Sequence, residues 1–150
     1  ILILSTDKDF AQLQRYANVR QWNPRDDKWV HTSDPYMFLK EHIIQGDSSD
    51  GVPNIRSKDD VFVGEGRQKP IMKKKLTVWL EQEPEDFCDE EMLRNYKRNQ
   101  ELIDLLNIPK DIHDQIIDQY QNYEVNDRSG LLNYFMKHRL KNLMDDIQSF

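Results

Sequence analysis

The apolar and polar positions of the first third of the chain predict a small β portion. Ile1–Leu4 is a short, wholly apolar run that is β-branched in part, which indicates a buried and parallel strand. Two further runs, Val19–Trp22 and Lys28–Thr32, flank turn residues that include Asn23-Pro24, so they predict a hairpin. The residues STDKDF after Leu4 would then lie at the carboxyl end of a strand, where open α/β sheets bind ligands.

A well-marked helix is predicted after the hairpin. Ser33 or Asp34 is a suitable N-cap, Pro35 fits the first helical turn, and Gly46 fits the end of the helix. The remaining pattern is almost entirely helical. We expect helices that start at Pro70 and at Pro109, and another that follows Pro84. A further helix would place Leu102, Leu105 and Leu106 on one face. The last expected helix closes the chain over residues 129–147, with apolar positions Leu131, Leu132, Phe135, Met136, Leu140, Leu143 and Ile147.

These patterns predict a mainly α chain with a small β portion. We expect residues 1–33 to form the end of an α/β sheet and residues 34–150 to form a helical domain. Residues 55–69 carry no clear pattern, and Gly64 and Gly66 suggest a turn or a loop there. The tryptophans and Tyr36 are expected in the core.

Composition narrows the class of protein. No apolar run approaches the roughly 20 residues of a membrane span, no signal peptide opens the chain, and a single cysteine, Cys88, fits a reducing compartment. We therefore expect a cytoplasmic protein without a membrane partner. The chain begins without Met, in what reads as the middle of a sheet, so we expect a fragment or a processed half.

The net charge of -6 argues against a nucleic-acid partner, but the charge is unevenly distributed. Residues 51–80 hold seven basic and three acidic side chains, whereas residues 81–127 hold four basic and fourteen acidic ones. The local field decides where a polyanion docks, so the basic segment is a candidate docking surface.

Two pairs of aspartates are the candidate metal ligands. Asp7 and Asp9 follow the first strand, and an extended backbone would point both toward a common cation. Asp47 and Asp50 follow the helix that ends at Gly46. Spacing alone leaves an alternative open for each pair: Asp7 as a helix cap with Asp9 as a solvated first-turn acid, and the second pair as turn residues. The four histidines, His31, His42, His113 and His138, show no ligand spacing.

The two segments STDKDFAQL and GDSSDGVPNI, taken together, resemble motifs of the 5′-nuclease family, which includes flap endonucleases and is closest here to phage-type ribonuclease H. In that family a D-x-D-x-x-Q-L segment supplies metal-binding aspartates. A G-D-x-x-D-N-[IV]-P-G loop lies within a helix-three-turn-helix motif that grips DNA. The chain departs from the second motif at Gly51, where Asn is usual. It also has NIRSKDDVFVGEGRQKP where most members carry a glycine-rich turn, which puts a monovalent-cation site in question.

The resemblance implies that the chain is the C-terminal half of a metal-dependent nuclease. Asp7, Asp9 and Asp50 correspond to ligands of two Mg²⁺ or Mn²⁺ ions that hydrolyse phosphodiesters, and Asp47 would support them. Expected DNA-binding residues are Ser48, Ser49 and Gly51 in the loop, and Arg67, Lys69, Lys73, Lys74 and Lys75 in the basic segment. The basic residues also fit a solvated helix face.

The resemblance further implies a role in DNA replication, removing RNA primers or 5′ flaps. Expected partners are double-stranded or branched DNA, RNA–DNA, the missing N-terminal nuclease half, and single-strand-binding protein or a sliding clamp. The chain alone would then lack part of the ligand set and be inactive. The alternative is a non-catalytic DNA-binding or replication-scaffold module.

Overall fold

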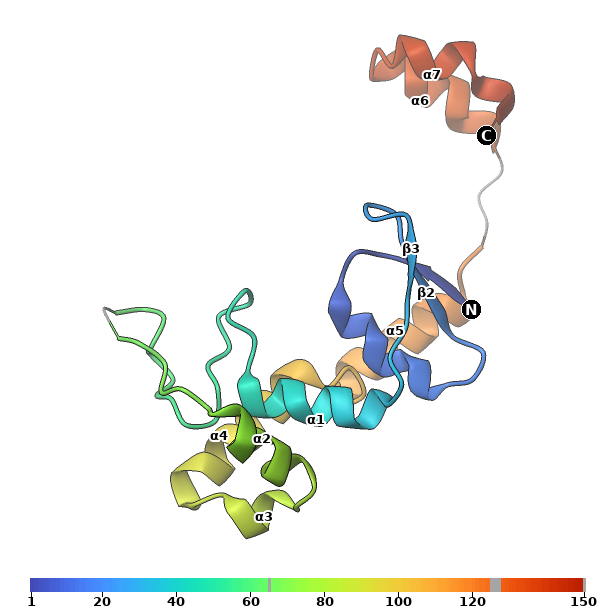
Figure 1. Ribbon diagram of the computed structural model, residues 1–150. Helices are drawn as coiled ribbons and strands as arrows, with labels where there is room; N and C mark the ends of the chain where they lie inside the picture. Colours follow the sequence, from blue (N-terminus) through green and yellow to red (C-terminus); the bar gives the residue numbers. More distant parts are fainter. Residues whose placement is uncertain (65, 125–127, 150) are drawn as a thin grey trace. The chain divides into compact units, whose positions relative to one another are not determined.

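A computed structural model describes residues 1–64, 66–124 and 128–149. The chain divides into two compact units, Ile1–Pro109 and Lys110–Phe150. Unit 1 contains strands β1 (Leu2–Leu4), β2 (Arg20–Asn23) and β3 (Lys28–Val30), the 3₁₀ helix η1 (Lys8–Arg15), and helices α1 (Pro35–Gln45), α2 (Lys73–Leu80), α3 (Pro84–Phe87) and α4 (Glu90–Ile103) (Figure 1). The prediction of a mainly α chain with a small β portion is confirmed.

The three strands form one sheet in the order β1-β2-β3. β1 pairs with β2 in parallel, with Ile3 opposite Gln21, and β2 pairs with β3 antiparallel. The predicted hairpin is confirmed, and its turn is fixed by the side chain of Asn23, which accepts hydrogen bonds from the N–H groups of Arg25 and Asp26.

The prediction that Ile1–Leu4 is buried is wrong for this chain. Leu2 and Leu4 are 55% and 67% exposed, although the strand is parallel as expected. β1 is an edge strand of the sheet, and β2 pairs with one of its edges. Its hydrophobic pattern is that of a buried strand, while its surroundings here are those of an exposed one.

Helix α1 forms where the sequence predicts it. The Asp34 side chain caps it by accepting from the N–H groups of Tyr36 and Met37, and Gly46 ends it with a φ of 69°. A Cβ on Gly46 would lie 2.6 Å from the carbonyl oxygen of Pro53, so this position requires glycine on two counts.

The helix expected from Pro70 begins at Lys73 instead, with Met72 as its N-cap. The Pro70 carbonyl accepts a hydrogen bond from the Arg56 guanidinium, and Ile71 packs against the core, which keeps residues 70–72 outside the helix. The start is therefore set by tertiary contacts rather than by the proline.

The core of unit 1 lies between α1, α2 and α4. Its buried side chains are Leu39, Ile43, Ile44, Val52, Ile55, Trp79, Tyr96 and Ile103. The expectation that aromatic residues lie in the core holds for Trp79 but is wrong for Trp29 and Tyr36, which are 55% and 65% exposed. The Trp29 ring contacts the Trp22 ring in a T-shaped pair, and Tyr36 lies beneath the Arg15 guanidinium.

Helix α4 ends at Ile103, so the predicted face of three leucines does not form, and Leu102 is 64% exposed. Gln12, which is fully buried, sets the end of α4. Its amide donates to the Ile103 carbonyl at 3.0 Å and accepts from the Leu105 N–H at 3.0 Å. The glutamine of the strand-end motif thus joins η1 to α4.

Unit 2 contains α5 (Lys110–Gln121), the 3₁₀ helices η2 (Arg128–Gly130) and η3 (Ile147–Ser149), α6 (Leu131–Lys137) and α7 (Lys141–Asp145). Helix α5 starts directly after Pro109, as predicted. The single closing helix is wrong, because the chain breaks between α6 and α7. There Arg139 has a φ of 55° and the Leu140 N–H bonds the Phe135 carbonyl at 2.9 Å.

The predicted domain boundary between residues 33 and 34 stays a prediction.

Across the described ranges, every helix is too short or too polar to cross a bilayer.

Candidate metal centre and nucleic-acid interface

The aspartates after β1 are held by a network of local hydrogen bonds. The Gln21 amide, fully buried in β2, donates to the carbonyls of Ser5 and Asp7 at 3.0 and 2.6 Å. The Asp7 carboxylate accepts from the Asp9 N–H at 2.9 Å and so caps η1. The segment that follows the strand is therefore fixed from β2.

The backbone from Asp7 to Asp9 is not extended, because η1 begins at Lys8. The condition under which both carboxylates would point the same way is therefore not met. Asp7 faces the start of η1, and Asp9 faces α1, where it meets His42. Their assignment as metal ligands stays a prediction that cannot rest on an extended backbone.

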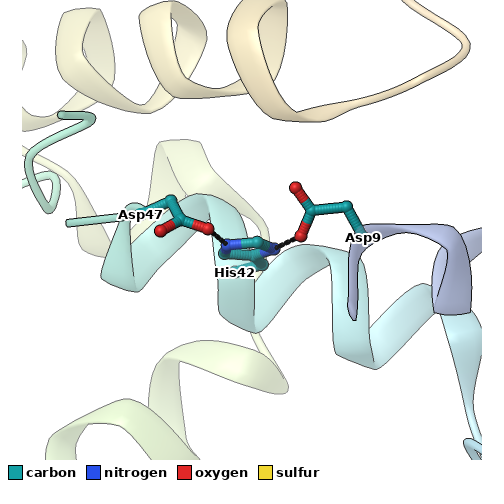
Figure 2. Close-up of side chains that lie close together, drawn as sticks. All are labelled: Asp9, His42 and Asp47. Atoms are coloured by element: carbon teal, nitrogen blue, oxygen red, sulfur yellow. Dashed lines mark hydrogen bonds and ion pairs between the residues drawn. The ribbon is translucent and has the colours of Figure 1, made fainter. Parts of the chain in front are cut away.

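His42, in the last turn of α1, lies between two carboxylates (Figure 2). Its Nε2 is 3.0 Å from Asp47 Oδ2, and its Nδ1 is 3.3 Å from Asp9 Oδ1. Asp9, His42 and Asp47 each offer a ligand atom, and these atoms lie within 4.8 Å of one another. Among the residues that the structure describes, Asp7 and Asp50 do not belong to this cluster.

The loop after α1 positions Asp47. The Val52 N–H bonds the Asp47 carbonyl at 2.7 Å and closes a tight turn in which Gly51 has a φ of 75°. Asp47 is 4% exposed, and its Oδ1 accepts from the Ser49 N–H at 2.9 Å and from the Ser49 hydroxyl. The exposed residues of this loop are Ser48, Ser49, Asp50 and Gly51.

The electrostatics of the two carboxylates beside His42 differ. Burial acts to raise the pKa of Asp47, but hydrogen bonds from Ser49, Lys8 and His42 outweigh it and hold that pKa well below its usual range. Burial raises the pKa of Asp9, and the neighbouring carboxylates add to this shift while His42 opposes it. Asp47 is thus saturated with donors, whereas the charged form of Asp9 lacks compensation.

Sequence reasoning missed His42. His42 and Asp47 are five residues apart in the sequence, and the end of α1 lies between them. This spacing suggests a contact only once the turn at Gly46 is known. The sequence contains no signal that η1 packs on α1 and brings Asp9 to the same ring.

The five basic residues expected to contact DNA are exposed in the structure: Arg67, Lys69, Lys73, Lys74 and Lys75. The last three form the first turn of α2, where no acidic residue offsets them. Like charges at the positive end of a helix dipole are unfavourable, so this placement leaves the lysines without local compensation. Lys75 lies over the Trp79 ring, with its Nζ 4.8 Å from the ring centroid.

The segment expected to be a loop, residues 55–69, is held at its base by Asn54 and Ser57. The Asn54 backbone N–H donates to the Gln68 side-chain oxygen at 2.7 Å, and the Asn54 side-chain amide donates to the Lys69 carbonyl at 2.9 Å. Ser57 Oγ donates to Asn54 Oδ1 and accepts from the Lys69 N–H, both at 2.9 Å. The two basic loop residues therefore emerge from a fixed base.

Helix α4 holds the other side of this loop through a repeated Arg-Asn pair. The buried Asn95 amide donates to the carbonyls of Ile55 and Ser57 at 3.0 and 3.2 Å. Four residues later, the buried Asn99 amide donates to the Pro53 carbonyl at 2.8 Å. The sequence RNYKRN places these groups on one helix face, a signal that sequence reasoning did not use.

The arginines of the same repeat grip the loop from outside. Arg94 and Arg98 both bind the carboxylate of Asp59. The hydrogen bond from Arg94 is the main cause that lowers the pKa of Asp59. The pairs are partly exposed, so they fix geometry more than they add stability.

The chain matches the family described as T4 RNase H, C terminal, over residues 33–150. It belongs to this family, and the resemblance to 5′ nucleases is confirmed. A curated relative, Ribonuclease H of Enterobacteria phage T4, is 32% identical over 157 residues, which cover 100% of this chain and 52% of that protein. The chain therefore spans about half the length of this relative.

Proposed function

We propose that the complete protein carrying this chain is a divalent-metal-dependent 5′ nuclease that removes RNA primers or 5′ flaps during DNA replication. The observation that supports this most is the placement of Asp9 of η1 beside His42 and Asp47 of α1 and its following loop, in a chain of the ribonuclease H family. The name of the relative, Ribonuclease H, supports nucleic acid as the substrate class.

The side chains fit a divalent cation by their chemistry. Asp9 Oδ1 is buried, and among the described residues no hydrogen bond reaches it, although the ring of His42 lies 3.3 Å away. Asp7, Asp9 and Asp50 are the proposed ligands of Mg²⁺ or Mn²⁺, two ions in the complete protein, with Asp47 supporting them. A monovalent-cation site near the loop stays an open prediction.

The bound ions would supply an activated water and stabilise the leaving oxygen of the phosphodiester. The residues of this chain fix where that chemistry takes place. Gln21 holds the backbone of Asp7, and Asp47 orients His42 against Asp9.

A nucleic-acid backbone would lie along the exposed loop and the basic segment. The proposed contacts are Ser48, Ser49 and Gly51, together with Arg67, Lys69, Lys73, Lys74 and Lys75. We interpret α1, the following loop and α2 as the helix-three-turn-helix motif that would grip double-stranded or branched DNA and RNA–DNA.

The interface is tested by replacing Lys73 and Lys74 together with glutamine, which leaves Lys75 over Trp79. The double variant should bind duplex DNA more weakly for all sequences alike. The slope of log K against log salt should flatten by about two units, near one for each lost phosphate contact. Fluorescence anisotropy across salt concentrations measures both quantities.

The matched control replaces the exposed Lys137 and Lys141 of unit 2 with glutamine and removes the same charge. If the α2 variant and this control have the same salt slope as the wild type, the lysines form only a solvated helix face.

We propose that the chain by itself does not cleave efficiently, because part of the ligand set would come from an N-terminal nuclease half. A cytoplasmic location and contacts with single-strand-binding protein or a sliding clamp belong to the same proposal. The alternative is a non-catalytic DNA-binding or replication-scaffold module, which would bind DNA with the same salt dependence but would never cleave it.

A further inference from the structure

Within the part of the chain that the structure describes, no hydrogen bond satisfies one buried ring nitrogen of His42. The His42 side chain is 8% exposed, and its Nδ1 has no described hydrogen-bond partner although Asp9 Oδ1 lies 3.3 Å away. Asp9 Oδ1 is likewise buried and accepts no hydrogen bond from a described residue. An unmet pair of polar atoms inside a protein is costly, so the contact requires an explanation.

The contacts of Asp47 determine which nitrogen of the ring carries a proton. Asp47 Oδ1 accepts a hydrogen bond from the Ser49 N–H at 2.9 Å. Asp47 Oδ2 lies 2.9 Å from Lys8 Nζ and accepts from it. An ionised carboxylate only accepts, so His42 Nε2, 3.0 Å from Oδ2, must donate to it. A neutral ring then directs the Nδ1 lone pair toward the Asp9 oxygen.

Two acceptors that face each other at 3.3 Å have the separation of neighbouring ligands on one ion. Ligands about 2.1 Å from a cation at a right angle lie about 3.0 Å apart. Moreover, a histidine that binds a metal usually donates its other N–H to a carboxylate, which is the relation between His42 and Asp47.

We propose that His42 Nδ1 and Asp9 Oδ1 together ligate one divalent cation, and that Asp47 orients the ring as a positioning residue. The inference rests on the proposed function, because that proposal already makes Asp9 a metal ligand. It adds a nitrogen ligand from α1 to a site that sequence reasoning described with carboxylates alone.

The nitrogen ligand determines which cation the site favours. Mg²⁺ prefers oxygen ligands, whereas imidazole suits transition-metal ions, and Mn²⁺ also accepts carboxylates and water. The site should therefore favour Mn²⁺ over Mg²⁺. A cavity of about 340 Å³, lined by Lys8, Phe38, Glu41, His42, Gln45 and Gly46, adjoins the ring.

The competing explanation is a protonated His42 that forms ion pairs with both carboxylates. It requires no cation and predicts no nitrogen bound to metal. The two explanations therefore differ in a direct spectroscopic observable.

The first experiment titrates the purified chain with Mn²⁺ and follows the free ion by electron paramagnetic resonance. His42→Gln, which retains a polar side chain of similar length, should weaken Mn²⁺ binding at least tenfold and reduce the preference for Mn²⁺ over Mg²⁺. His31→Gln is the matched control, since His31 is exposed and lies outside the cluster, and it should bind Mn²⁺ as the wild type does. Circular dichroism confirms that each variant is folded.

The second experiment needs no variant. Pulsed electron paramagnetic resonance of the Mn²⁺-loaded wild type should show hyperfine coupling to an imidazole nitrogen. Absence of this coupling, or of any Mn²⁺ binding, would overturn the inference. Binding that His42→Gln leaves unchanged would overturn it too, but would keep the proposed nuclease with carboxylate ligands alone. If the complete wild-type protein shows no metal-dependent cleavage, the proposed function itself is wrong.

Discussion

Replacement of Asn99 tests how α4 supports the candidate site. Asn99 is fully buried, and its amide donates to the carbonyls of Ile43 and Pro53, both at 2.8 Å. The first carbonyl belongs to the end of α1 that carries His42, and the second follows the turn that carries Asp47. Asn99→Ala therefore removes two of the hydrogen bonds that join α4 to the site.

The magnitude follows from which partners remain. The Pro53 carbonyl keeps a bond from the Arg98 guanidinium at 3.0 Å, whereas no other bond to the Ile43 carbonyl is found within the described ranges. One unsatisfied buried acceptor costs about 1–3 kcal/mol, and one lost hydrogen bond costs about 1 kcal/mol more. We expect Asn99→Ala to lower the free energy of unfolding by about 3 kcal/mol. Asn99→Asp should lower it further, because it turns a donor into a charged acceptor.

Urea denaturation followed by tryptophan fluorescence measures this loss. The three tryptophans, Trp22, Trp29 and Trp79, all lie in unit 1, so the signal reports the unit that contains Asn99. The matched control is Gln100→Ala, an exposed change on the same helix, which should stay within about 0.5 kcal/mol of the wild type. A loss below about 1 kcal/mol for Asn99→Ala, or an Asn99→Asp variant no less stable than it, would refute the reasoning.

Two further changes test the fold around the site. Burial raises the pKa of Tyr96 to about 12, so the stability that the protonated Tyr96 contributes is complete below the ordinary pKa near 10 and is lost as the pH rises toward 12. Between pH 8 and 11 the free energy of unfolding of Tyr96→Phe, measured by urea denaturation, should gain about 1.4 kcal/mol relative to the wild type. Equal losses of stability in the two proteins would contradict the burial argument. Gly46→Ala should cost at least about 2 kcal/mol in thermal unfolding, because φ is 69° and the Pro53 carbonyl is 2.6 Å from the added Cβ. Gly64→Ala, whose added Cβ would have no described atom outside its chain neighbours within 4 Å, should cost little, and equal costs for the two variants would contradict the argument.

Local signals predicted the elements that local interactions determine. The cap at Asp34, the terminator Gly46 and the turn after Asn23 each act within a few residues, and all are found where expected. The helix expected from Pro70 and the expected face of Leu102, Leu105 and Leu106 do not form, because tertiary bonds decide those helix ends. Arg56 holds the Pro70 carbonyl, and Gln12 holds the end of α4.

The candidate site was predicted only in part for the same reason. The two motifs indicated Asp9 and Asp47, which the structure brings to one ring. His42 lacks a motif, and its role depends on the packing of η1 on α1, which no spacing in the sequence encodes. The clamp of Asn95 and Asn99 has a readable repeat, but its partners are backbone carbonyls that any sequence would offer.

Cleavage by the complete protein carrying this chain tests the central claim most directly. A duplex with a 5′-labelled RNA segment is incubated with Mg²⁺ or Mn²⁺, and release of the label is followed for the wild type, Asp9→Asn and the exposed control Asp86→Asn. The account predicts metal-dependent release by the wild type and the control, and a loss of at least about a thousandfold in Asp9→Asn. Wild-type rates in Asp9→Asn, or no release by the wild type with either metal, would contradict it.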